Sequence, residues 1–394
     1  MALRRPRVTY NPNDIPTAAC MPPLLGLPTL HLRGTPRQMG EAHGAELSAT
    51  IRAFVQMRLE AAILWGSAFA PVVGGEPISV GKLIDAGRAC LDAYERWDGD
   101  GHTEHCAIAR AAGVHPTELY TAANMTDVRD VLVFGDKGDS AALGLRADAE
   151  GCSAVLLPPG RTRNGHLVAA QTWDLNPQDL DYVVAIHRSP DSGPQTWSVT
   201  CTGCLSLVGM NALGLCVGTT NVKTRGSRPG VGYMGILHRM INSGSFDHAA
   251  KVCETAPRAA AHTYWLASED RAAEWETTAW SAVRRELGTQ PILRTNHCLV
   301  GAHQIQEGEA PSNSSLARLA RLRIATGPER RHDVASLRAL FGDRSDGVDS
   351  INRLPEDAQG TATNSVVVCA PKTREIWACR GPADRGAWQL LPFD

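Results

Sequence analysis

From residue 153 onward the chain consists largely of short β-prone segments, and this series limits the fold more than any other feature. The segments are rich in Val, Leu and Thr, and turn-favouring Gly, Pro, Asn and Asp residues separate them. The pattern predicts strands at 153–157, 166–172, 182–187, 196–201, 205–209, 215–219, 264–267, 275–278, 292–299, 365–369 and 375–379. Consecutive short strands of this kind are typical of antiparallel sheets.

The chain before these strands has the periodicity of helices. From Thr35 to Ile63, apolar residues recur mostly at spacings of four, which predicts an amphipathic helix. Ser79 is placed to cap a second helix that reaches Trp97. Further helices are expected at 103–112, 116–124, 232–242, 246–255, 314–324 and 334–340. Helices in pairs between blocks of strands predict an α+β fold of two stacked sheets covered by helices.

Composition argues against several classes of protein. The 43% hydrophobic content supports a large core, and a net charge of −2 without a dense Lys/Arg run argues against nucleic acid as a partner. The longest apolar stretch, 61–73, is interrupted by Gly66, Ser67 and Pro71, so no membrane association is expected. The N-terminus lacks the apolar core of a signal peptide. We therefore expect a cytoplasmic protein whose 11 cysteines are mostly reduced.

The clearest boundary is the polar segment 136–150, and it leads directly to Gly151-Cys152 at the start of a β-prone run. A thiol at the head of a strand, preceded by the residue that tolerates the widest range of backbone angles, suits a self-cleaving nucleophile. The ordinary alternative is a buried strand cysteine that has only a packing role.

Four polar residues further along the chain are candidates to assist this thiol, although each also has an ordinary interpretation. Asp174 follows a predicted strand and could be a turn aspartate. Asn221 and Asn296 lie at strand ends, where asparagine often caps a loop. Arg318 lies in a helix, where a long cationic side chain usually snorkels or forms an ion pair.

Several short motifs of the chain, taken in order, resemble the motifs of one known family. The motifs are Gly40-Glu41-Ala42-His43-Gly44, Gly151-Cys152, Gln171-Thr172-Trp173-Asp174, Gly209-Met210-Asn211 with Asn221, Thr295-Asn296-His297, and Ser315 with Arg318 and Arg321. In these motifs and their order, the chain is similar to the isopenicillin N acyltransferase-like (acyl-CoA:6-aminopenicillanic acid acyltransferase) Ntn hydrolases. That family is related to choloylglycine hydrolases and penicillin V acylases. The resemblance implies an αββα four-layer sandwich with a helical N-terminal segment.

The resemblance also implies that the chain cleaves itself between Gly151 and Cys152. The products would be a mostly helical small subunit, 1–151, and a core subunit, 152–394, which stay associated. The Cys152 thiolate would attack the Gly151 carbonyl, and water would hydrolyse the thioester. Cleavage leaves Cys152 with a free α-amine, whose pKa of roughly 7.7–8 suits a general base for its own thiol.

By the same resemblance, Asp174 would hydrogen-bond the α-amine, and Asn221 would donate to the oxyanion, an interaction worth about 3–4 kcal/mol in the transition state. Asn296 would orient the amine or the tetrahedral intermediate, and Arg318 would support Cys152 and Asp174 electrostatically. Gln171 occupies a position where bile-salt hydrolases carry an arginine.

The expected substrate is a small N-acyl compound or acyl donor, cleaved or formed at an amide without a cofactor or metal. Gln171, Trp173 and Tyr233 are the candidate substrate-binding residues, and Trp265 and Trp280 are further candidates for an apolar acyl site. The cationic loop 223–228 is a candidate to attract a substrate carboxylate, although an ordinary solvated loop explains it better. Homo-oligomer formation stays open.

Three alternatives stay open at the level of sequence. Cys201-Thr202-Gly203-Cys204 could form half of a zinc site with His297-Cys298, although no second Cys-x-x-Cys or Cys-x-x-His follows. A cysteine hydrolase with a histidine base would act without cleavage. An unprocessed member of the family could act as a non-catalytic binding protein, although it would not need the whole set of catalytic residue types.

Overall fold

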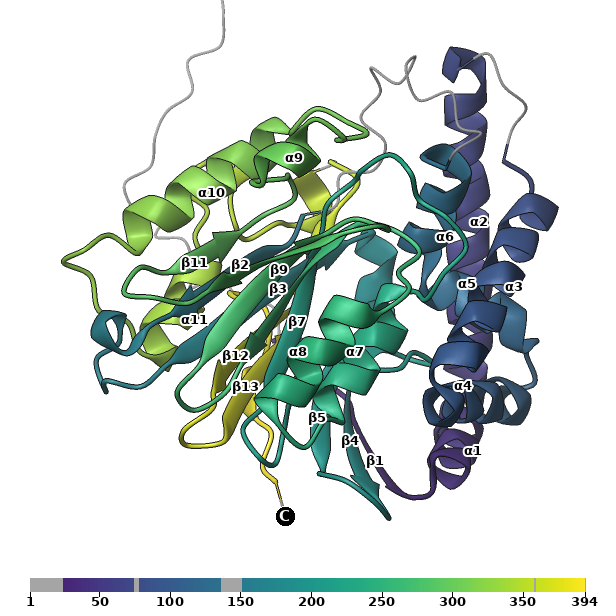
Figure 1. Ribbon diagram of the computed structural model, residues 1–394, viewed down its shortest axis with the longest axis horizontal. Helices are drawn as coiled ribbons and strands as arrows, with labels where there is room; N and C mark the ends of the chain where they lie inside the picture. The colour runs from purple at the N-terminus through teal and green to yellow at the C-terminus, as the bar shows by residue number, and fades with distance from the viewer. Residues whose placement is uncertain (1–23, 74–77, 136–150, 358, 394) are drawn as a thin grey trace, which may run out of the picture.

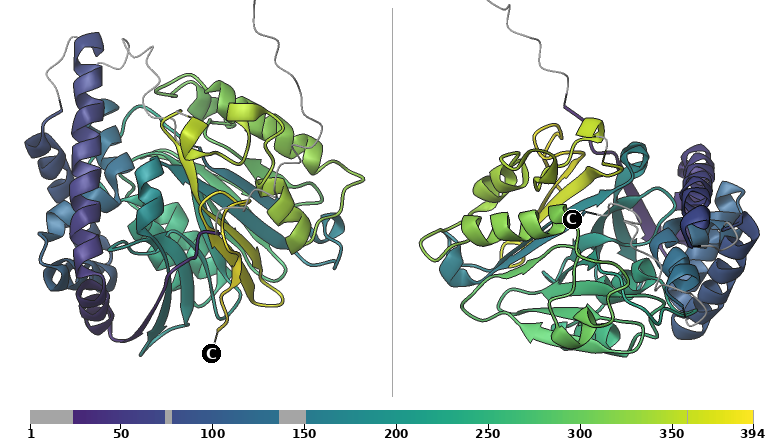
Figure 2. Two further views of the ribbon diagram at one scale, coloured as in Figure 1. Left: turned by 180° about the vertical axis from the view of Figure 1, so that it is seen from behind. Right: turned by 90° about the horizontal axis from the view of Figure 1, so that it is seen from above.

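The computed structural model describes residues 24–73, 78–135, 151–357 and 359–393, and it shows two β-sheets stacked face to face with helices on their outer faces (Figure 1). A helical bundle lies beside one end of the stack (Figures 1 and 2). The predicted α+β class and the four-layer αββα arrangement are both confirmed.

The smaller sheet has six antiparallel strands in the order β11-β2-β3-β12-β13-β14. Its strands are β2 (Ser153–Leu157), β3 (Val168–Leu175), β11 (Ile292–Arg294), β12 (Ala362–Ala370), β13 (Glu375–Arg380) and β14 (Gln389–Leu390). The strand that follows Gly151-Cys152 is therefore an inner strand of this sheet, paired on both sides.

The larger sheet has eight strands in the order β1-β4-β5-β6-β7-β8-β9-β10. Its strands are β1 (Thr29–Gly34), β4 (Val183–Pro190), β5 (Thr196–Cys201), β6 (Val208–Asn211), β7 (Cys216–Asn221), β8 (His262–Ala267), β9 (Ala272–Thr277) and β10 (Ala282–Glu286). Among the strands that the structure describes in this sheet, only the β1–β4 pair is parallel, and the other pairs are antiparallel. The N-terminal part of the chain thus contributes one edge strand to this sheet.

Both faces of the smaller sheet are buried, and alternate residues face different layers. On β2, Ala154 and Leu156 pack into the core between the sheets, whereas Val155 and Leu157 pack under helices together with Leu340 and Phe341. The near-continuous apolar sequence of β2 follows from this double burial.

Helices cover the outer face of each sheet. α7 (Tyr233–Ile241) and α8 (Phe246–Thr255) pack on the larger sheet, and α10 (Asn313–Ala325) and α11 (Val334–Phe341) pack on the smaller one. The short helix α9 (Gly301–Gln304) precedes α10. All four of the longer helices lie within a residue of their predicted bounds.

Six helices form the bundle beside the sheets. They are α1 (Pro36–Glu46), α2 (Ser48–Val73), α3 (Val80–Trp97), α4 (Gly99–Ala112), α5 (Pro116–Ala123) and α6 (Met125–Val133). The single helix predicted from Thr35 is two helices, because the backbone leaves helical geometry at Leu47. Ser79 caps α3 as predicted, since its hydroxyl accepts a hydrogen bond from the Lys82 amide. Within the described residues, no helix is long and apolar enough to cross a lipid bilayer.

The Gly-x-x-x-Gly pattern of α1 allows a close helix crossing. A β-carbon on Gly40 would lie 2.4 Å from the Glu104 carbonyl oxygen, and one on Gly44 would lie 2.3 Å from the Ile108 oxygen, both on α4. Between these glycines, the His43 imidazole Nε2 accepts a hydrogen bond from the Gly203 amide of the core, at 3.0 Å. The motif therefore attaches the bundle to the larger sheet.

Several observed strands, including β14, were not predicted or have other bounds than predicted. β1 lies in a region predicted only as an extended lead-in, because its pairing with β4 is long-range and leaves no local signal. β10 was not predicted, because its residues are mostly exposed and charged. β11 ends at Arg294 instead of 299, and the chain beyond it turns to place Asn296 near Cys152.

Candidate active site

Cys152 lies immediately before β2 and alongside the end of β3. Its side chain is buried, with 5% exposure, and Sγ lies 4.0 Å from the Asp174 backbone oxygen. The same oxygen accepts a hydrogen bond from the Gly151 amide at 3.3 Å. The Gly151–Cys152 bond is therefore held against the C-terminal end of β3.

Arg318 projects from α10 and hydrogen-bonds several groups in this region. Its Nη1 donates to the Cys152 carbonyl oxygen at 2.5 Å and to Ser153 Oγ at 3.0 Å, and its Nε donates to Ser314 Oγ at 3.1 Å. Burial, reinforced by the nearby Arg353 charge, lowers the pKa of the Arg318 guanidinium to about 10. The group still carries its charge at neutral pH.

Asn296 joins Arg318 to the strand that carries Asn221. Its Oδ1 accepts a hydrogen bond from Arg318 Nη2 at 2.9 Å, and its Nδ2 donates to the Asn221 backbone oxygen at 3.1 Å. Its own amide donates to Ser315 Oγ at 2.9 Å. Because both ends of the side-chain amide are engaged, the orientation of Asn296 is fixed.

Asn221 is the last residue of β7, the strand of the larger sheet that lies against β2 and β3. Its side chain is buried, with 7% exposure. The five residues predicted as catalytic therefore meet where the ends of β2, β3 and β7 come together. They are Cys152, Asp174, Asn221, Asn296 and Arg318.

The Asp174 carboxylate is fully enclosed, with 1% exposure. Burial raises its pKa to about 6, although the positive charges of Arg318 and Arg353 oppose the rise. Hydrogen bonds from the Thr363 and Thr172 side chains also oppose the rise in pKa, although among the described residues neither carboxylate oxygen has a partner of strict hydrogen-bond geometry. The carboxylate thus retains the capacity to accept a hydrogen bond from a group that forms later, such as an α-amine on Cys152.

The raised pKa of Asp174 predicts a specific dependence of stability on pH. Between the ordinary pKa of about 4 and the folded value of about 6, the folded protein binds one more proton than the unfolded chain. We therefore expect Asp174 to lower the free energy of unfolding by about 3 kcal/mol as the pH rises through this range. Urea unfolding between pH 4 and pH 7 measures this effect as the difference in free energy of unfolding between two unprocessed chains. One chain is Cys152→Ala, and the other carries Asp174→Asn in addition. If the difference between the two chains does not change between pH 4 and pH 7, the expectation is wrong.

Arg353 is a second buried arginine at the site, and sequence reasoning missed it. Its Nη2 donates to Gln359 Oε1 at 2.6 Å. Its Nη1 lies so close to Gly151 that a β-carbon there would be 2.3 Å away. A side chain at position 151 would therefore have to displace the buried end of Arg353. Arg353 belongs to an ordinary loop sequence, and no motif or spacing distinguishes it from other arginines.

We expect Gly151→Ala to destabilise the chain by about 1–3 kcal/mol, because the added methyl group collides with the buried Arg353 side chain. Urea unfolding in the Cys152→Ala background measures this without interference from processing. Gly160→Ala is the matched control, since a β-carbon there meets nothing within 4 Å and should cost little or even stabilise. Equal effects of the two substitutions would contradict the steric argument.

The residues predicted to bind substrate have different surroundings. Gln171 joins the two sheets, since its side chain exchanges hydrogen bonds with the Thr219 backbone at 2.5 and 3.0 Å and accepts one from the Trp265 indole at 2.5 Å. Trp173 is buried in the core between the sheets. Trp280 is 62% exposed and stacks with Arg228.

Tyr233 lies beside the end of the strand that carries Asn221. Its ring stacks on His262 with a centroid distance of 4.8 Å, and His262 is the β8 residue paired with Asn221. The Tyr233 amide donates to Asp127 Oδ2 at 2.9 Å, and His262 Nε2 lies 3.1 Å from Asp127 Oδ1. Asp127 on α6 thus ties the helical bundle to the site.

Cys201 and Cys204 flank a tight turn after β5, in which the Cys204 amide donates to the Cys201 oxygen. Both are buried, and burial raises the pKa of both thiols. Within the described ranges, no three or more His, Cys, Asp or Glu side chains are grouped to hold a metal ion.

The model of one family, described as acyl-coenzyme A:6-aminopenicillanic acid acyl-transferase, matches residues 161–384. The chain belongs to this family. The match contains Asp174, Asn221, Asn296 and Arg318 and begins after Cys152. Membership makes amide hydrolysis or acyl transfer the general class of reaction, and the chain is an enzyme of this general type.

Similar solved structures include two hydrolases. A penicillin V acylase from Agrobacterium tumefaciens is 14% identical, with 61% of this chain and 86% of that chain covered and a TM-score of 0.40. A conjugated bile acid hydrolase from Clostridium perfringens is 9% identical, with 62% and 97% covered and a TM-score of 0.36. A search of curated proteins finds no match.

Proposed function

We propose that the chain is a self-processing enzyme whose N-terminal cysteine, Cys152, cleaves or forms amides through a thioester. The hydrogen-bonded series Cys152–Arg318–Asn296–Asn221 is the observation that carries this proposal. It joins groups from four separate parts of the chain at the residue that carries the thiol. A cysteine with only a packing role would not require a buried arginine and an oriented asparagine beside it.

In the processing step, Cys152 Sγ attacks the Gly151 carbonyl carbon while the Gly151–Cys152 C–N bond breaks, and the nitrogen gains a proton. The thiol proton is lost, and an N-to-S acyl shift leaves Gly151 as a thioester on Cys152. Water then adds to the thioester and releases the Gly151 carboxylate. Cys152 regains its thiol and now carries a free α-amine.

In the catalytic step, the α-amine removes the thiol proton, and the thiolate attacks the acyl carbon of the substrate. The bond from that carbon to its leaving group breaks, and the leaving group, an amine when the substrate is an amide, takes the proton from the α-ammonium. The Asp174 carboxylate accepts a hydrogen bond from the amine. The Asn221 side chain donates to the oxyanion, Asn296 orients the amine or the tetrahedral intermediate, and Arg318 compensates the negative charge nearby. In hydrolysis water takes the acyl group from Cys152, and in acyl transfer an amine takes it. Both outcomes use the same thioester.

The two fragments are expected to remain together after cleavage. The strand β1 of the small fragment pairs with β4 of the large one over six residues. Glu104 of α4 forms a buried ion pair with Arg188 of β4 at 2.8 Å, with both side chains 1% exposed. Separation would leave these charges and the strand edge without partners.

Acylation of Cys152 tests this proposal directly. The purified protein is incubated with p-nitrophenyl octanoate, the reaction is quenched in acid, and the intact mass of each fragment is measured by mass spectrometry. We expect a mass increase of one octanoyl group on the fragment that begins at Cys152, and peptide mapping should place it on that residue. The other described cysteines are also buried, so labelling elsewhere, or no labelling, would count against the proposal.

A further inference from the structure

The Arg353 guanidinium lies against Gly151, the residue before the expected cleavage point. A β-carbon on Gly151 would lie 2.3 Å from Arg353 Nη1. Because a β-carbon is bonded about 1.5 Å from its α-carbon, Nη1 lies within about 4 Å of the Gly151 α-carbon. The carbonyl carbon that Cys152 would attack is bonded directly to this α-carbon. The guanidinium is therefore a close neighbour of the acyl group that self-cleavage would transfer to sulfur.

The smaller sheet holds Arg353 in this place. Thr363 on β12 is the register partner of Asp174 on β3, and the Asp174 backbone oxygen accepts a hydrogen bond from the Gly151 amide. The Arg353 amide donates to Thr363 Oγ1 at 3.0 Å, and the Arg353 backbone oxygen accepts from the Thr363 amide at 3.0 Å. Two paired strands thus anchor both backbones, and the buried Arg353 side chain, which is 2% exposed, reaches from one to the other.

In the proposed self-cleavage, negative charge develops twice on the Gly151 carbonyl oxygen. When Cys152 Sγ bonds to the carbonyl carbon, the π electrons of the C=O bond move to oxygen, and they return as the C–N bond breaks. When water adds to the thioester, the same oxygen again carries the charge until the C–S bond breaks. Within the described ranges, the structure shows no hydrogen bond to this oxygen. A buried oxyanion needs a donor or a positive charge close by.

Arg318, the other guanidinium beside the scissile bond, is already engaged. Its Nη1 donates to the Cys152 carbonyl oxygen and to Ser153 Oγ, and its Nη2 donates to Asn296 Oδ1. Its Nε donates to Ser314 Oγ. These four bonds leave one of the five N–H groups of a guanidinium. Arg318 is therefore committed to the residue that follows the scissile bond.

Arg353 has N–H groups to spare. Its Nη2 donates to Gln359 Oε1 at 2.6 Å, whereas its buried Nε has no acceptor among the described residues. Burial lowers the pKa of Arg353, and the negative charges of Asp174 and Asp349 oppose this shift. An arginine keeps its charge at neutral pH. The side chain thus provides both a positive charge and unused donors beside Gly151.

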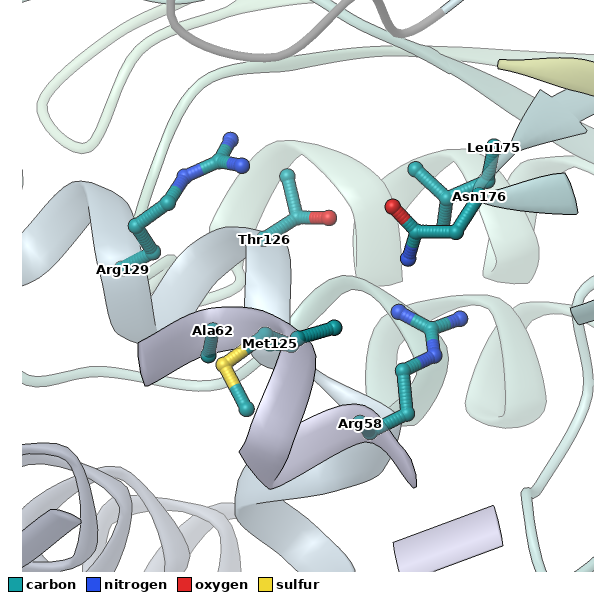
Figure 3. A pocket seen from close by; sticks show the side chains of 8 residues that line it. Arg58, Ala62, Met125, Thr126, Arg129, Leu175 and Asn176 are labelled. Carbon is teal, nitrogen blue, oxygen red and sulfur yellow. The ribbon is translucent and has the colours of Figure 1, made fainter. Parts of the chain in front are cut away.

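Two other arginines of this region serve a different place. Arg58 and Arg129 line a pocket between α2, α6 and the end of β3, and Gly151 does not line it (Figure 3). Arg58 Nε lies 2.8 Å from Asp179 Oδ1, and Arg129 Nη2 lies 3.5 Å from Asp130 Oδ1. These arginines are therefore held by carboxylates and are not in contact with the scissile bond.

The cationic loop 223–228, which the sequence suggested as a site for a substrate carboxylate, also has local partners. Lys223 forms an ion pair with Glu309 at 3.2 Å. Arg228 stacks on Trp280 at 3.6 Å. The charges of this loop are therefore engaged with partners other than Gly151.

We propose that Arg353 stabilises the oxyanion on Gly151 during self-cleavage and is an electrostatic catalyst of the processing reaction. Arg353 acts on the residue before the scissile bond, and Arg318 acts on the residue after it. This inference rests on the proposed function, since it adds a residue to the processing step of the same site.

The test follows cleavage after cell-free synthesis, by intact mass under denaturing conditions at successive times. Loss of one oxyanion donor typically slows a reaction by about 10²–10³-fold, so we expect Arg353→Gln to slow the appearance of the two fragments by about 10²-fold. Arg353→Lys keeps the positive charge and should regain at least about tenfold of this loss. Arg344→Gln is the matched control, because Arg344 holds the same loop through the Asn352 oxygen and Asp357, each at 2.7 Å. This variant should be processed at the wild-type rate.

The pH dependence of Arg353→Lys separates an effect of charge from an effect of structure. A lysine ammonium loses its charge as the pH rises through its pKa, which is ordinarily about 10.4 and is lowered by burial, whereas arginine stays charged. The cleavage rate of Arg353→Lys relative to the wild type should therefore fall by about tenfold between about pH 7 and about pH 10. This measurement decides the question if Arg353→Gln does not fold. A constant ratio would overturn the inference.

Other outcomes separate this inference from the proposed function. Equal cleavage rates in the wild type and Arg353→Gln overturn the inference and leave the proposed function in place. Equal slowing by Arg353→Gln and Arg344→Gln also overturns it, because the loop as a whole would then be responsible. Arg353→Lys as slow as Arg353→Gln overturns the role of charge. A wild-type chain that never cleaves would refute the proposed self-processing itself, and the inference with it.

Discussion

The Cys152→Ala variant is expected to remain a single full-length chain, whereas the wild-type protein should yield two fragments that end at Gly151 and begin at Cys152. Alanine has no nucleophile to attack the Gly151 carbonyl, so neither the acyl shift nor the thioester can form. Amide hydrolysis should also fall by at least about 10³-fold, because the same sulfur carries both reactions. Intact mass under denaturing conditions and turnover of an N-acyl substrate measure the two effects.

The control for this experiment is Cys253→Ala. Cys253 lies on α8 and is also fully buried, but it packs on the outer face of the larger sheet. This variant should be processed like the wild type. If the wild-type protein stays intact and still turns over amides, self-cleavage is wrong and a histidine-assisted cysteine hydrolase becomes the better interpretation.

Arg318→Met should block processing and lower the free energy of unfolding by about 3–5 kcal/mol. Removal of the guanidinium leaves the Cys152 carbonyl and Asn296 Oδ1 buried without a donor. It also removes positive charge that stabilises the buried Asp174 carboxylate. Urea unfolding in the unprocessed Cys152→Ala background measures stability, and intact mass in the Cys152 background measures processing.

Arg321→Met provides the matched control for this change. Arg321 projects from the same helix, but its side chain is 26% exposed and pairs with Asp346 at the surface. An exposed ion pair contributes at most about 1 kcal/mol, so this variant should process normally. Comparable losses in Arg318→Met and Arg321→Met would show that α10 as a whole, and not the buried guanidinium, is what matters.

The candidate catalytic residues were selected from the sequence because the short motifs that contain them occur in the order of a known family. Cys152 follows a glycine at the head of a strand, Asn221 ends a strand, and Asn296 lies two residues beyond the end of one. Arg318 lies on a helix with an otherwise ordinary amphipathic pattern, and only its place in the order of motifs distinguished it. Processing and the individual catalytic roles stay predictions until the variants are measured.

Other parts of the site left no local signal. The contact of Arg353 with Gly151 joins residues about 200 positions apart, and neither sequence context indicates the other. Gln171 lies in a motif that suggested substrate binding, yet its hydrogen bonds to Thr219 and Trp265 join the two sheets. A side chain's type and spacing do not reveal which distant backbone groups will satisfy it.

Strand and helix positions, the α+β class and the likeness to one family followed from the sequence, because periodicity, turn residues and caps are local properties of the chain. The pairing of β1 with β4, the proximity of Arg353 to Gly151, and the burial that raises the pKa of Asp174 were decided by tertiary structure. Each depends on segments that are distant in sequence and meet only when the two sheets and the helical bundle pack together. Desolvation and steric fit arise from that packing, so no single segment encodes them.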